Sequence, residues 1–275
     1  MRKTPRVAVL LVVVCLCLVS IQCFAADKGV SPSPVIDRIL AKKELVVGTA
    51  ASMPPFNMTT KDGQIVGMEI DLVRMFAAAM DVKLTLKAMR FEELLPAIDA
   101  GKVDMVLSAM TITPERNLKR AFAGPYFDSG KSILAKSANA SSLDASSKLN
   151  LPDKTLVALK GSTSQRFAET LLPKAKLLLA ESYDQAVAMV REDKAMAMIA
   201  DFPICLVSVY RYPEAGFATL DKPLSYEPIG VALPPNDPLL LNWVQNFLHT
   251  LDKYGEIKNL KDKWFQSGPW VQEIK

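Results

Sequence analysis

Histidine and cysteine are scarce in this chain of 275 residues. It has one histidine, His249, and three of its four cysteines lie among the first 25 residues, which leaves Cys205 alone in the remainder. A lone cysteine cannot form an intramolecular disulfide, and a single histidine supplies neither a metal-ligand set nor, without partners, a serine-type catalytic site. These counts argue against a histidine-based catalytic site and a metal centre; no catalytic residue, metal or cofactor is predicted.

The first 25 residues also lack acidic side chains. A basic start, "MRKTPR", precedes an apolar run over residues 7–19, and "CFA" then offers small residues before a cleavage point. This pattern predicts a secretory signal peptide over residues 1–25. The run is shorter than the roughly 18 apolar residues of a membrane span. Lipid attachment at Cys23 is not expected, because "SIQ" before it is a poor match.

Most of the net positive charge of the chain comes from this leader segment. Removal of its three cations lowers the formal charge from +4 to +1. A chain so nearly neutral gives no electrostatic argument for binding nucleic acid. No later apolar run is long enough to cross a membrane, and 50% apolar with 23% charged residues is an ordinary globular balance.

After a polar tether over residues 26–36, short β-branched runs alternate with helical periodicity. This order of elements predicts an α/β fold with parallel strands. A first unit spans residues 44–108, and a second unit of similar size follows a Ser- and Asn-rich interval. Strands are expected at 44–49, 82–87, 103–108, 131–136, 155–160, 175–180, 195–200 and 227–234, and helices at 69–80, 91–101, 164–172, 183–193, 256–265 and after Asp237.

Polar chemistry follows the carboxyl ends of three expected strands. "SAMTITPER" ends in Arg116, in the first turn of a helix that Thr113 caps and Pro114 begins. A cation there opposes the helix dipole, which indicates a task for it. "KGSTSQRF" offers a glycine turn and a hydroxyl-rich helix start, a ready anion site. Asp201 follows the apolar run "AMAMIA".

Together these groups fit a free amino acid. Arg116 would bind a carboxylate through two parallel bonds, and Asp201 would receive an ammonium. Each group has a structural alternative: Arg116 as a solvated surface side chain, the "GST" turn as a simple helix cap, and Asp201 as the N-cap of a helix over 202–210.

In order and spacing, seven segments resemble the bacterial extracellular solute-binding proteins of family 3, the periplasmic amino-acid receptors of ABC importers. The resemblance covers about residues 37–265. Its carriers are "LVVGTAASMPPFN", "GQIVGMEIDLVRMFA", "FEELLPAIDAGKVDMVLSAMTITPER", "AFAGPYF", "LKGSTSQRFAE", "IADF" and "KYGEIKNLKDKWF".

The family implies a two-lobe periplasmic-binding-protein-like fold of type II. Each lobe would be a mostly parallel sheet flanked by helices, with a two-strand hinge. Lobe 1 would comprise residues 37–129 plus 228–275, and lobe 2 residues 130–227. A periplasmic monomer that delivers its ligand to a membrane permease is expected.

Site residues follow from motif position in the family. Arg116 resembles the arginine that pairs with the ligand carboxylate, with the hydroxyl of Thr111 added. The backbone near Ala109 would receive the amino group, which Asp201 would hold. From lobe 2, Thr163 and its neighbour Ser162 would reach the carboxylate.

Two further residues would face the ligand side chain. Phe91 matches an aromatic that flanks it, and Met53 stands where many members place a second aromatic. Ala50 stands where receptors for Lys, Arg or His tend to carry an acid. This departure favours a neutral or apolar side chain, although an adaptable Met53 would also allow several ligands.

Two other functions are weighed. Periplasmic cyclohexadienyl dehydratases share the fold and the arginine, but carry a catalytic glutamate where this chain has Ile204. General acid catalysis needs a placed proton donor, so this departure argues against an enzyme, with Glu227 as another possible acid in the cleft. A ligand-sensing adaptor is the third function. Such modules continue into another domain, whereas this chain ends soon after the last family helix.

Overall fold

The computed structural model describes residues 32–142, 146–266 and 268–273. The predicted signal peptide and most of the tether lie outside these residues. Pro34, which we expected in the tether, instead begins helix α2 (Pro34–Lys42). This start is fixed because Asp237 accepts hydrogen bonds from the backbone N–H groups of Val35 and Ile36, at 2.7 and 2.9 Å.

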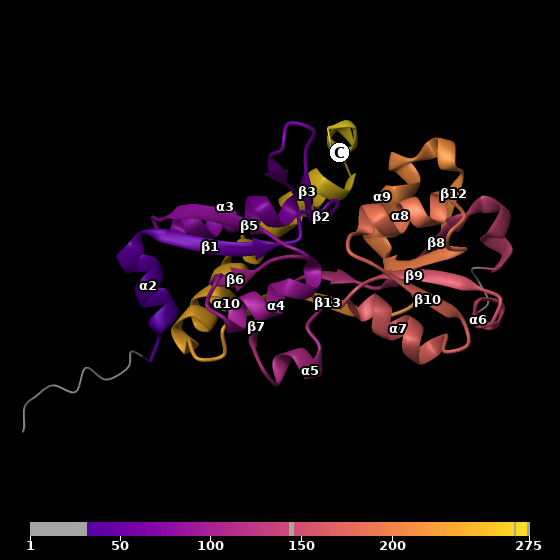
Figure 1. Ribbon diagram of the computed structural model, residues 1–275. Helices are drawn as coiled ribbons and strands as arrows, with labels where there is room; N and C mark the ends of the chain where they lie inside the picture. Colours follow the sequence, from indigo (N-terminus) through magenta and orange to yellow (C-terminus); the bar gives the residue numbers. More distant parts are fainter. Residues whose placement is uncertain (1–31, 143–145, 267, 274–275) are drawn as a thin grey trace, which may run out of the picture.

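The chain folds into two lobes, each built on a five-stranded sheet (Figure 1). We call lobe 1 the part on the first sheet. In spatial order, its strands are β5 (Lys83–Ala88), β1 (Glu44–Thr49), β6 (Met105–Val106), β13 (Glu227–Leu233) and β7 (Ala121–Ser129). A small antiparallel sheet, absent from our sequence prediction, adds β2 (Ser52–Met53), β3 (Asn57–Thr59) and β4 (Ile65–Val66).

Lobe 2 is the part on the second sheet. Its strands, in spatial order, are β10 (Lys176–Ala180), β9 (Thr155–Leu159), β11 (Ala197–Asp201), β8 (Lys131–Lys136) and β12 (Phe217–Thr219). Figure 1 shows α7 on one face of this sheet and α8 and α9 on the other. Its helices are η1 (Ser137–Ser142), α6 (Ser146–Leu149), α7 (Thr163–Leu171), α8 (Tyr183–Arg191), α9 (Phe202–Arg211) and η2 (Pro213–Ala215).

Helices pack on both faces of the lobe 1 sheet, with α3 and α4 on opposite sides of β1 (Figure 1). The lobe 1 helices are α3 (Met68–Ala79), α4 (Phe91–Asp99), α5 (Pro114–Asn117), α10 (Pro238–Lys253) and α11 (Glu256–Lys261), followed by η3 (Asp262–Gln266) and η4 (Pro269–Gln272). The apolar stripe that predicted a helix after Asp237 is buried as expected, with Leu240, Val244, Leu248 and Leu251 facing inward.

The two-lobe α/β architecture is confirmed, but each sheet is mixed rather than mostly parallel. In lobe 1, β1 pairs in parallel with β5 and β6, whereas β13 pairs antiparallel with β6 and β7. In lobe 2, β8 runs antiparallel to β11 and β12. The reason is the crossover: β7 leaves lobe 1, β8 enters lobe 2 directly after Gly130, and β13 returns alongside β7.

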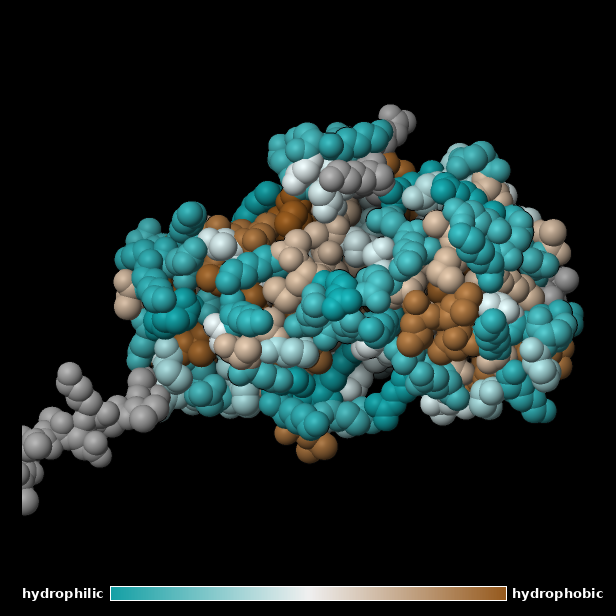
Figure 2. Space-filling view, viewed as in Figure 1, coloured by the Kyte–Doolittle hydropathy of each residue, from teal (hydrophilic) through white to brown (hydrophobic). Residues whose placement is uncertain are grey.

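On the face shown in Figure 2, hydrophilic residues predominate on both lobes, and hydrophobic residues form separate patches. Within the described part of the chain, no helix combines the length and apolar composition needed to cross a membrane.

Candidate functional site

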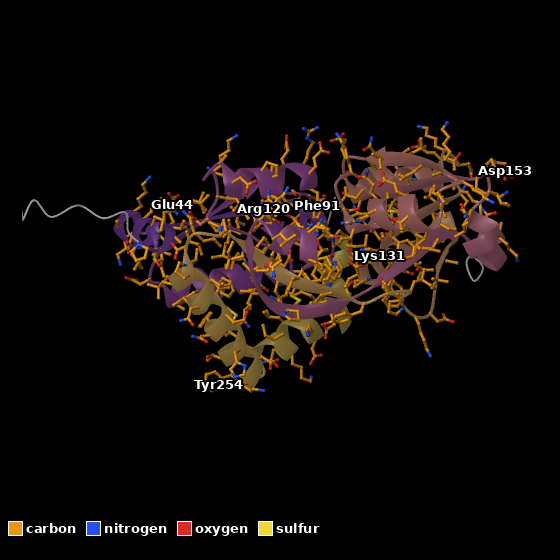
Figure 3. The ribbon with its side chains drawn as sticks, turned by 90° about the horizontal axis from the view of Figure 1, so that it is seen from below. Glu44, Phe91, Arg120, Lys131, Asp153 and Tyr254 are labelled. Atoms are coloured by element: carbon orange, nitrogen blue, oxygen red, sulfur yellow. The ribbon has the colours of Figure 1, made fainter. Side chains whose placement is uncertain are left out.

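The candidate site lies where the two lobes meet. Figure 3 labels Phe91, at the start of α4 in lobe 1, and Lys131, at the start of β8 in lobe 2, close to this junction. The carboxyl ends of β6, β9 and β11 lead into the loops that our sequence analysis singled out. Such strand ends are where open α/β sheets bind ligands.

The loop after β6 is held in an unusual backbone conformation. Ala109 has a φ of 45°, in the left-handed region that a residue with a Cβ seldom adopts and that costs on the order of 1 kcal/mol. Its N–H donates to Oε1 of the buried Glu69 at 2.7 Å. Two backbone hydrogen bonds tie the loop to β13, from Ile112 to Pro228 and from Gly230 to Met110. These three hydrogen bonds therefore hold the loop in one conformation.

Arg116 reaches from lobe 1 to lobe 2. As predicted, Thr113 is the N-cap of the one-turn helix α5 and accepts the Arg116 N–H at 3.3 Å. The guanidinium Nη1 donates to the Thr111 carbonyl at 2.9 Å, and Nη2 donates to the Gly161 carbonyl at 3.3 Å. Its Cζ lies 5.9 Å from the centroid of the Phe91 ring. Arg116 is thus partly buried and directed across the junction toward lobe 2.

In lobe 2, the turn between β9 and α7 contacts the Arg116 guanidinium. Gly161 has a φ of 74°, which suits a tight turn, and the Ser162 side chain caps α7 by accepting the Gln165 N–H. The Ser162 hydroxyl also donates to the Leu159 carbonyl at 2.6 Å. The next residue, Thr163, places its hydroxyl oxygen 3.3 Å from that of Thr111 in lobe 1. Two predicted site residues from different lobes are therefore in contact.

Asp201 ends β11 and is 4% exposed. It precedes α9 as its N-cap residue but makes no side-chain capping bond there. Its Oδ1 instead accepts from Lys131 Nζ at 2.6 Å. Burial raises the pKa of the Asp201 carboxyl, while the Lys131 ammonium acts in the opposite direction.

Lys131, which our sequence analysis did not single out, pairs with Asp201 at the lobe junction. Its side chain is fully buried, and its ammonium also lies 3.4 Å from Glu227 Oε2. Burial lowers the pKa of the Arg116 guanidinium, and the charges of Asp201 and Glu227 oppose that shift. The cleft thus holds two cations and two carboxylates. The sequence does contain a signal that could have identified Lys131: it is a lysine at the start of a strand whose next four residues are apolar or small.

The two residues expected near a ligand side chain are both buried. Phe91 is 5% exposed and lies beneath the Arg116 guanidinium. Met53 is 1% exposed, and its sulfur accepts from the Ser108 hydroxyl at 3.3 Å, so it supports the loop after β6.

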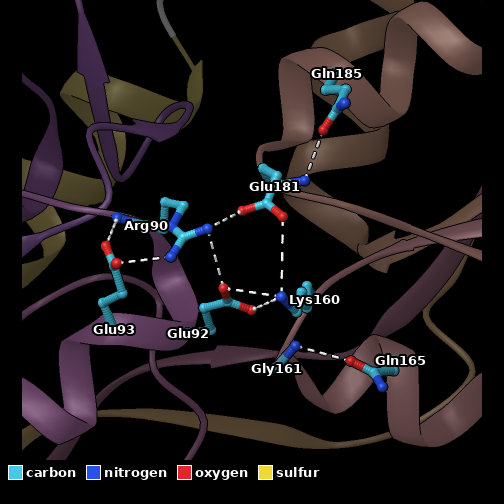
Figure 4. A network of polar contacts seen from close by, with 8 residues as sticks. All are labelled: Arg90, Glu92, Glu93, Lys160, Gly161, Gln165, Glu181 and Gln185. Atoms are coloured by element: carbon cyan, nitrogen blue, oxygen red, sulfur yellow. Dashed lines mark hydrogen bonds and ion pairs between the residues drawn. The ribbon is translucent and has the colours of Figure 1, made fainter.

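A network of ion pairs joins the two lobes at one edge of their junction (Figure 4). From lobe 1, Arg90 Nη1 lies 3.0 Å from Glu181 Oε2 of lobe 2. From lobe 2, Lys160 Nζ lies 3.0 Å from Glu92 Oε2 of lobe 1. Arg90 also pairs with Glu93. This rim network, Arg90, Glu92, Glu93, Lys160 and Glu181, was not foreseen from the sequence.

The arrangement offers a guanidinium, two hydroxyls and a buried carboxylate on opposing walls. These groups complement a small molecule that carries both a carboxylate and an ammonium. Within residues 32–142, 146–266 and 268–273, no cluster of three or more His, Cys, Asp or Glu side chains is arranged to hold a metal ion.

Comparison with known proteins agrees with this geometry. The family model of the bacterial extracellular solute-binding proteins, family 3, matches residues 45–267. The chain is 26% identical to ABC transporter arginine-binding protein 1 of Escherichia coli (strain K12), over 82% of this chain and 92% of that protein.

Two solved structures are similar over almost their whole length. The ancestral amino acid-binding protein AncCDT-1, described as a precursor of cyclohexadienyl dehydratase, is 37% identical with a TM-score of 0.78, over 84% of this chain and 99% of that one. A putative ABC transporter binding component from Wolinella succinogenes DSM 1740, complexed with lysine, is 34% identical with a TM-score of 0.80, over 84% and 100%.

Proposed function

Because this chain belongs to the bacterial extracellular solute-binding proteins, family 3, we propose that it is a periplasmic receptor that binds a free amino acid between its lobes and delivers it to the permease of an ABC importer. The observation that carries the proposal is the position of Arg116. Its guanidinium spans the two lobes at a place where hydroxyls and the buried Asp201 carboxylate also converge.

The ligand carboxylate is assigned to Arg116. Its guanidinium offers a planar pair of donors, and the Thr111 and Thr163 hydroxyls lie on either side of the lobe junction to add further bonds. Ser162 acts through the turn that it caps, since its hydroxyl already donates to the Leu159 carbonyl.

The ligand ammonium is assigned to Asp201 and to the carbonyl of the fixed loop at Ala109. The ligand side chain then points toward Phe91, with Met53 behind the loop. A ligand that contacts both lobes stabilises the closed form through its higher affinity for that form, and the permease would bind the closed form.

The neutral or apolar side-chain preference of our sequence analysis is not supported. Arginine and lysine, the ligands named for two of the relatives above, are both cationic. That preference rested on the missing acid at Ala50, whereas the rim network brings three carboxylates and two cations to the cleft. We take cationic amino acids as the first candidates, because they are the ligands named for these relatives.

The remaining assignments are part of the same proposal. The chain is exported by residues 1–25 and acts in the periplasm as a monomer, without lipid at Cys23. The proposed lobe boundaries lie at residues 129/130 and 227/228, which would put the hinge directly after β7 and at the start of β13.

An enzyme on this fold is the second candidate, because AncCDT-1 is described as a precursor of cyclohexadienyl dehydratase. Ile204, buried at the start of α9, offers no proton, and Glu227 is paired with Lys131. We therefore propose binding rather than turnover. Incubation with prephenate or arogenate tests the choice, and formation of an aromatic product would overturn it.

The experiment for the proposed function is a thermal-shift screen of the purified mature chain against the twenty amino acids, dipeptides and small carboxylates, followed by calorimetry. Binding of arginine or lysine is expected. A screen in which no amino acid raises the melting temperature, while another class of solute does, would contradict it.

A further inference from the structure

Lys131 and Asp201 form an ion pair that the sheet itself imposes. The two residues are directly opposite each other in the antiparallel ladder of β8 and β11. Side chains of such a pair point to the same face of the sheet. The Lys131 backbone is fixed as well, since its N–H donates to Ser225 Oγ at 3.0 Å and its carbonyl accepts the Leu224 N–H at 2.7 Å.

The pair lies at the place assigned to the ligand ammonium. Lys131 Nζ is 2.6 Å from Asp201 Oδ1, the distance of a short charge-assisted hydrogen bond. The lysine side chain is fully buried and that of Asp201 is 6% exposed, so solvent screens the pair little. An amino acid entering the cleft therefore meets a carboxylate that already has a cation.

Glu227 gives the lysine a second partner. Its Oε2 lies 3.4 Å from the same Nζ, and its side chain is 12% exposed. Movement of the ammonium from Asp201 toward Glu227 would keep it paired throughout. The two cations, Arg116 and Lys131, balance the two carboxylates, and a zwitterion preserves that balance.

We propose that Lys131 is a selectivity residue, an internal ammonium that competes with the ligand ammonium for Asp201 and moves toward Glu227 when an amino acid binds. This inference rests on the proposed function and refines it. Lys131 would set how strongly the cleft prefers an amino acid over the same molecule without its α-amino group. Without Lys131, the ligand ammonium would have Asp201 to itself.

The test compares ligand pairs that differ only in the α-amino group. L-Arginine is paired with 5-guanidinopentanoate, and L-leucine with 4-methylpentanoate, so that cationic and neutral ligands are both covered. Calorimetry gives the ratio of the two dissociation constants for wild type and Lys131→Gln. The ratio should rise at least about tenfold in the variant, because one charge-assisted hydrogen bond no longer has a competitor.

Two variants are controls. Lys131→Arg keeps the cation and should leave the ratio within about threefold of wild type. Lys136→Gln removes the same charge from the far end of β8, where the lysine pairs with Asp193, and should leave it unchanged. If Lys131→Gln alone does not fold, Lys131→Gln with Glu227→Gln keeps the charges balanced and should show the same rise.

The outcomes separate two failures. A ratio that is unchanged or lower in Lys131→Gln, with amino-acid binding retained by wild type, overturns the inference alone, because Lys131 would then support the ligand or only the fold. If wild type and variants bind no amino acid, the proposed function fails and the inference with it.

Discussion

Glu69 holds Ala109 in place through a single hydrogen bond, from the Ala109 N–H to Glu69 Oε1 at 2.7 Å. The same oxygen accepts the Tyr126 hydroxyl, and Oε2 accepts from Asn57 Nδ2 at 2.6 Å. Glu69 is fully buried, in the first turn of α3. One side chain thus satisfies three buried donors and supports Ala109, the left-handed residue in the loop after β6.

Glu69→Ala should lower the free energy of unfolding by about 2–5 kcal/mol, because it leaves those three donors unpaired and opens a cavity. Glu69→Gln should cost less than about 1.5 kcal/mol. Its oxygen still accepts from Ala109 and Tyr126. Its NH2 group faces Asn57, whose side-chain oxygen is buried without a partner and can accept from that NH2 group once the Asn57 amide flips. Urea unfolding measures both variants, and equal losses would contradict this account.

The difference in free energy of unfolding between wild type and Glu69→Gln should depend on pH, and this dependence tests the protonation state of Glu69. Burial raises the pKa of its carboxyl above the ordinary 4.5, so the folded protein holds the proton more tightly than the unfolded chain does. The corresponding stabilisation is present below pH 4.5 and is lost as the pH rises through the raised pKa. The free energy of unfolding of wild type relative to Glu69→Gln should therefore fall as the pH rises from 4.5. A difference that is constant or increases from pH 4.5 to 8 would argue against a raised pKa.

Arg116→Ala should weaken amino-acid binding by roughly 30-fold to several thousand-fold, the cost of leaving a buried charge without its partner. The fold should survive, because the guanidinium bonds are to two loop carbonyls, Thr111 and Gly161, rather than to a buried carboxylate. Calorimetry with L-arginine and L-lysine measures the loss.

Arg74→Ala is the matched control, since Arg74 pairs with Asp71 on the exposed side of α3. The affinity of Arg74→Ala for L-arginine and L-lysine should stay at the wild-type value. Binding by Arg116→Ala within about threefold of wild type would show that the carboxylate is held elsewhere.

The rim network should slow ligand release. Opening the lobes breaks the Arg90–Glu181 and Lys160–Glu92 pairs, all of them partly exposed. Exposed pairs contribute little each, so Arg90→Gln with Lys160→Gln should raise the release rate about two- to fivefold at low salt. Stopped-flow displacement measures it.

The faster release of the double variant should disappear in high salt, because the Debye length falls to about 3 Å at 1 M. Lys154→Gln, which removes a lysine paired with Asp153 within lobe 2, is the control and should leave release unchanged. An equal effect of the double variant at both salt concentrations would mean that the network does not act through charge.

Local patterns predicted the elements that present the site. β1 and β8 have the predicted bounds, and Thr113 caps α5 as its hydroxyl and the following proline indicated. These features depend on residues close in sequence, so a single chain suffices to find them. Other strands of the lobe 1 sheet were harder to predict. β7, at its edge, was not predicted, and "VDMVLS", at its centre, forms a strand only over Met105–Val106, after which the Ser108 hydroxyl accepts the Ala50 N–H.

Partnerships across the sheets could not be read from the sequence. Lys131 meets Asp201 only because β8 runs antiparallel to β11 with these residues opposite, a register that neither strand encodes alone. Glu69 begins the helix predicted over 69–80, but its partner Ala109 lies 40 residues further along the chain, beyond the reach of any local pattern. The ion pairs of the rim network depend on how the lobes approach each other, which no local pattern reports.

The N-caps of α7 and α8 are equivalent, so mutating each one distinguishes an effect on stability from an effect on ligand binding. Ser162 accepts the Gln165 N–H at 3.1 Å, and Ser182 accepts the Gln185 N–H at 3.2 Å. Each glutamine in turn accepts the N–H of the residue before its serine, as Figure 4 shows. Ser162→Ala and Ser182→Ala should each lower the free energy of unfolding by about 1 kcal/mol, since each removes one N-cap bond.

Ligand affinity should respond to only one of the two variants. Ser162 positions the turn that carries Thr163, whereas α8, which Ser182 caps, contains none of the residues assigned to the ligand. Ser162→Ala should therefore weaken amino-acid binding severalfold, and Ser182→Ala should leave it unchanged. Urea unfolding and calorimetry on the same preparations give both quantities. A parallel loss of affinity in the two variants would show that binding follows global stability, and the turn at Ser162 would then have no particular role in the cleft.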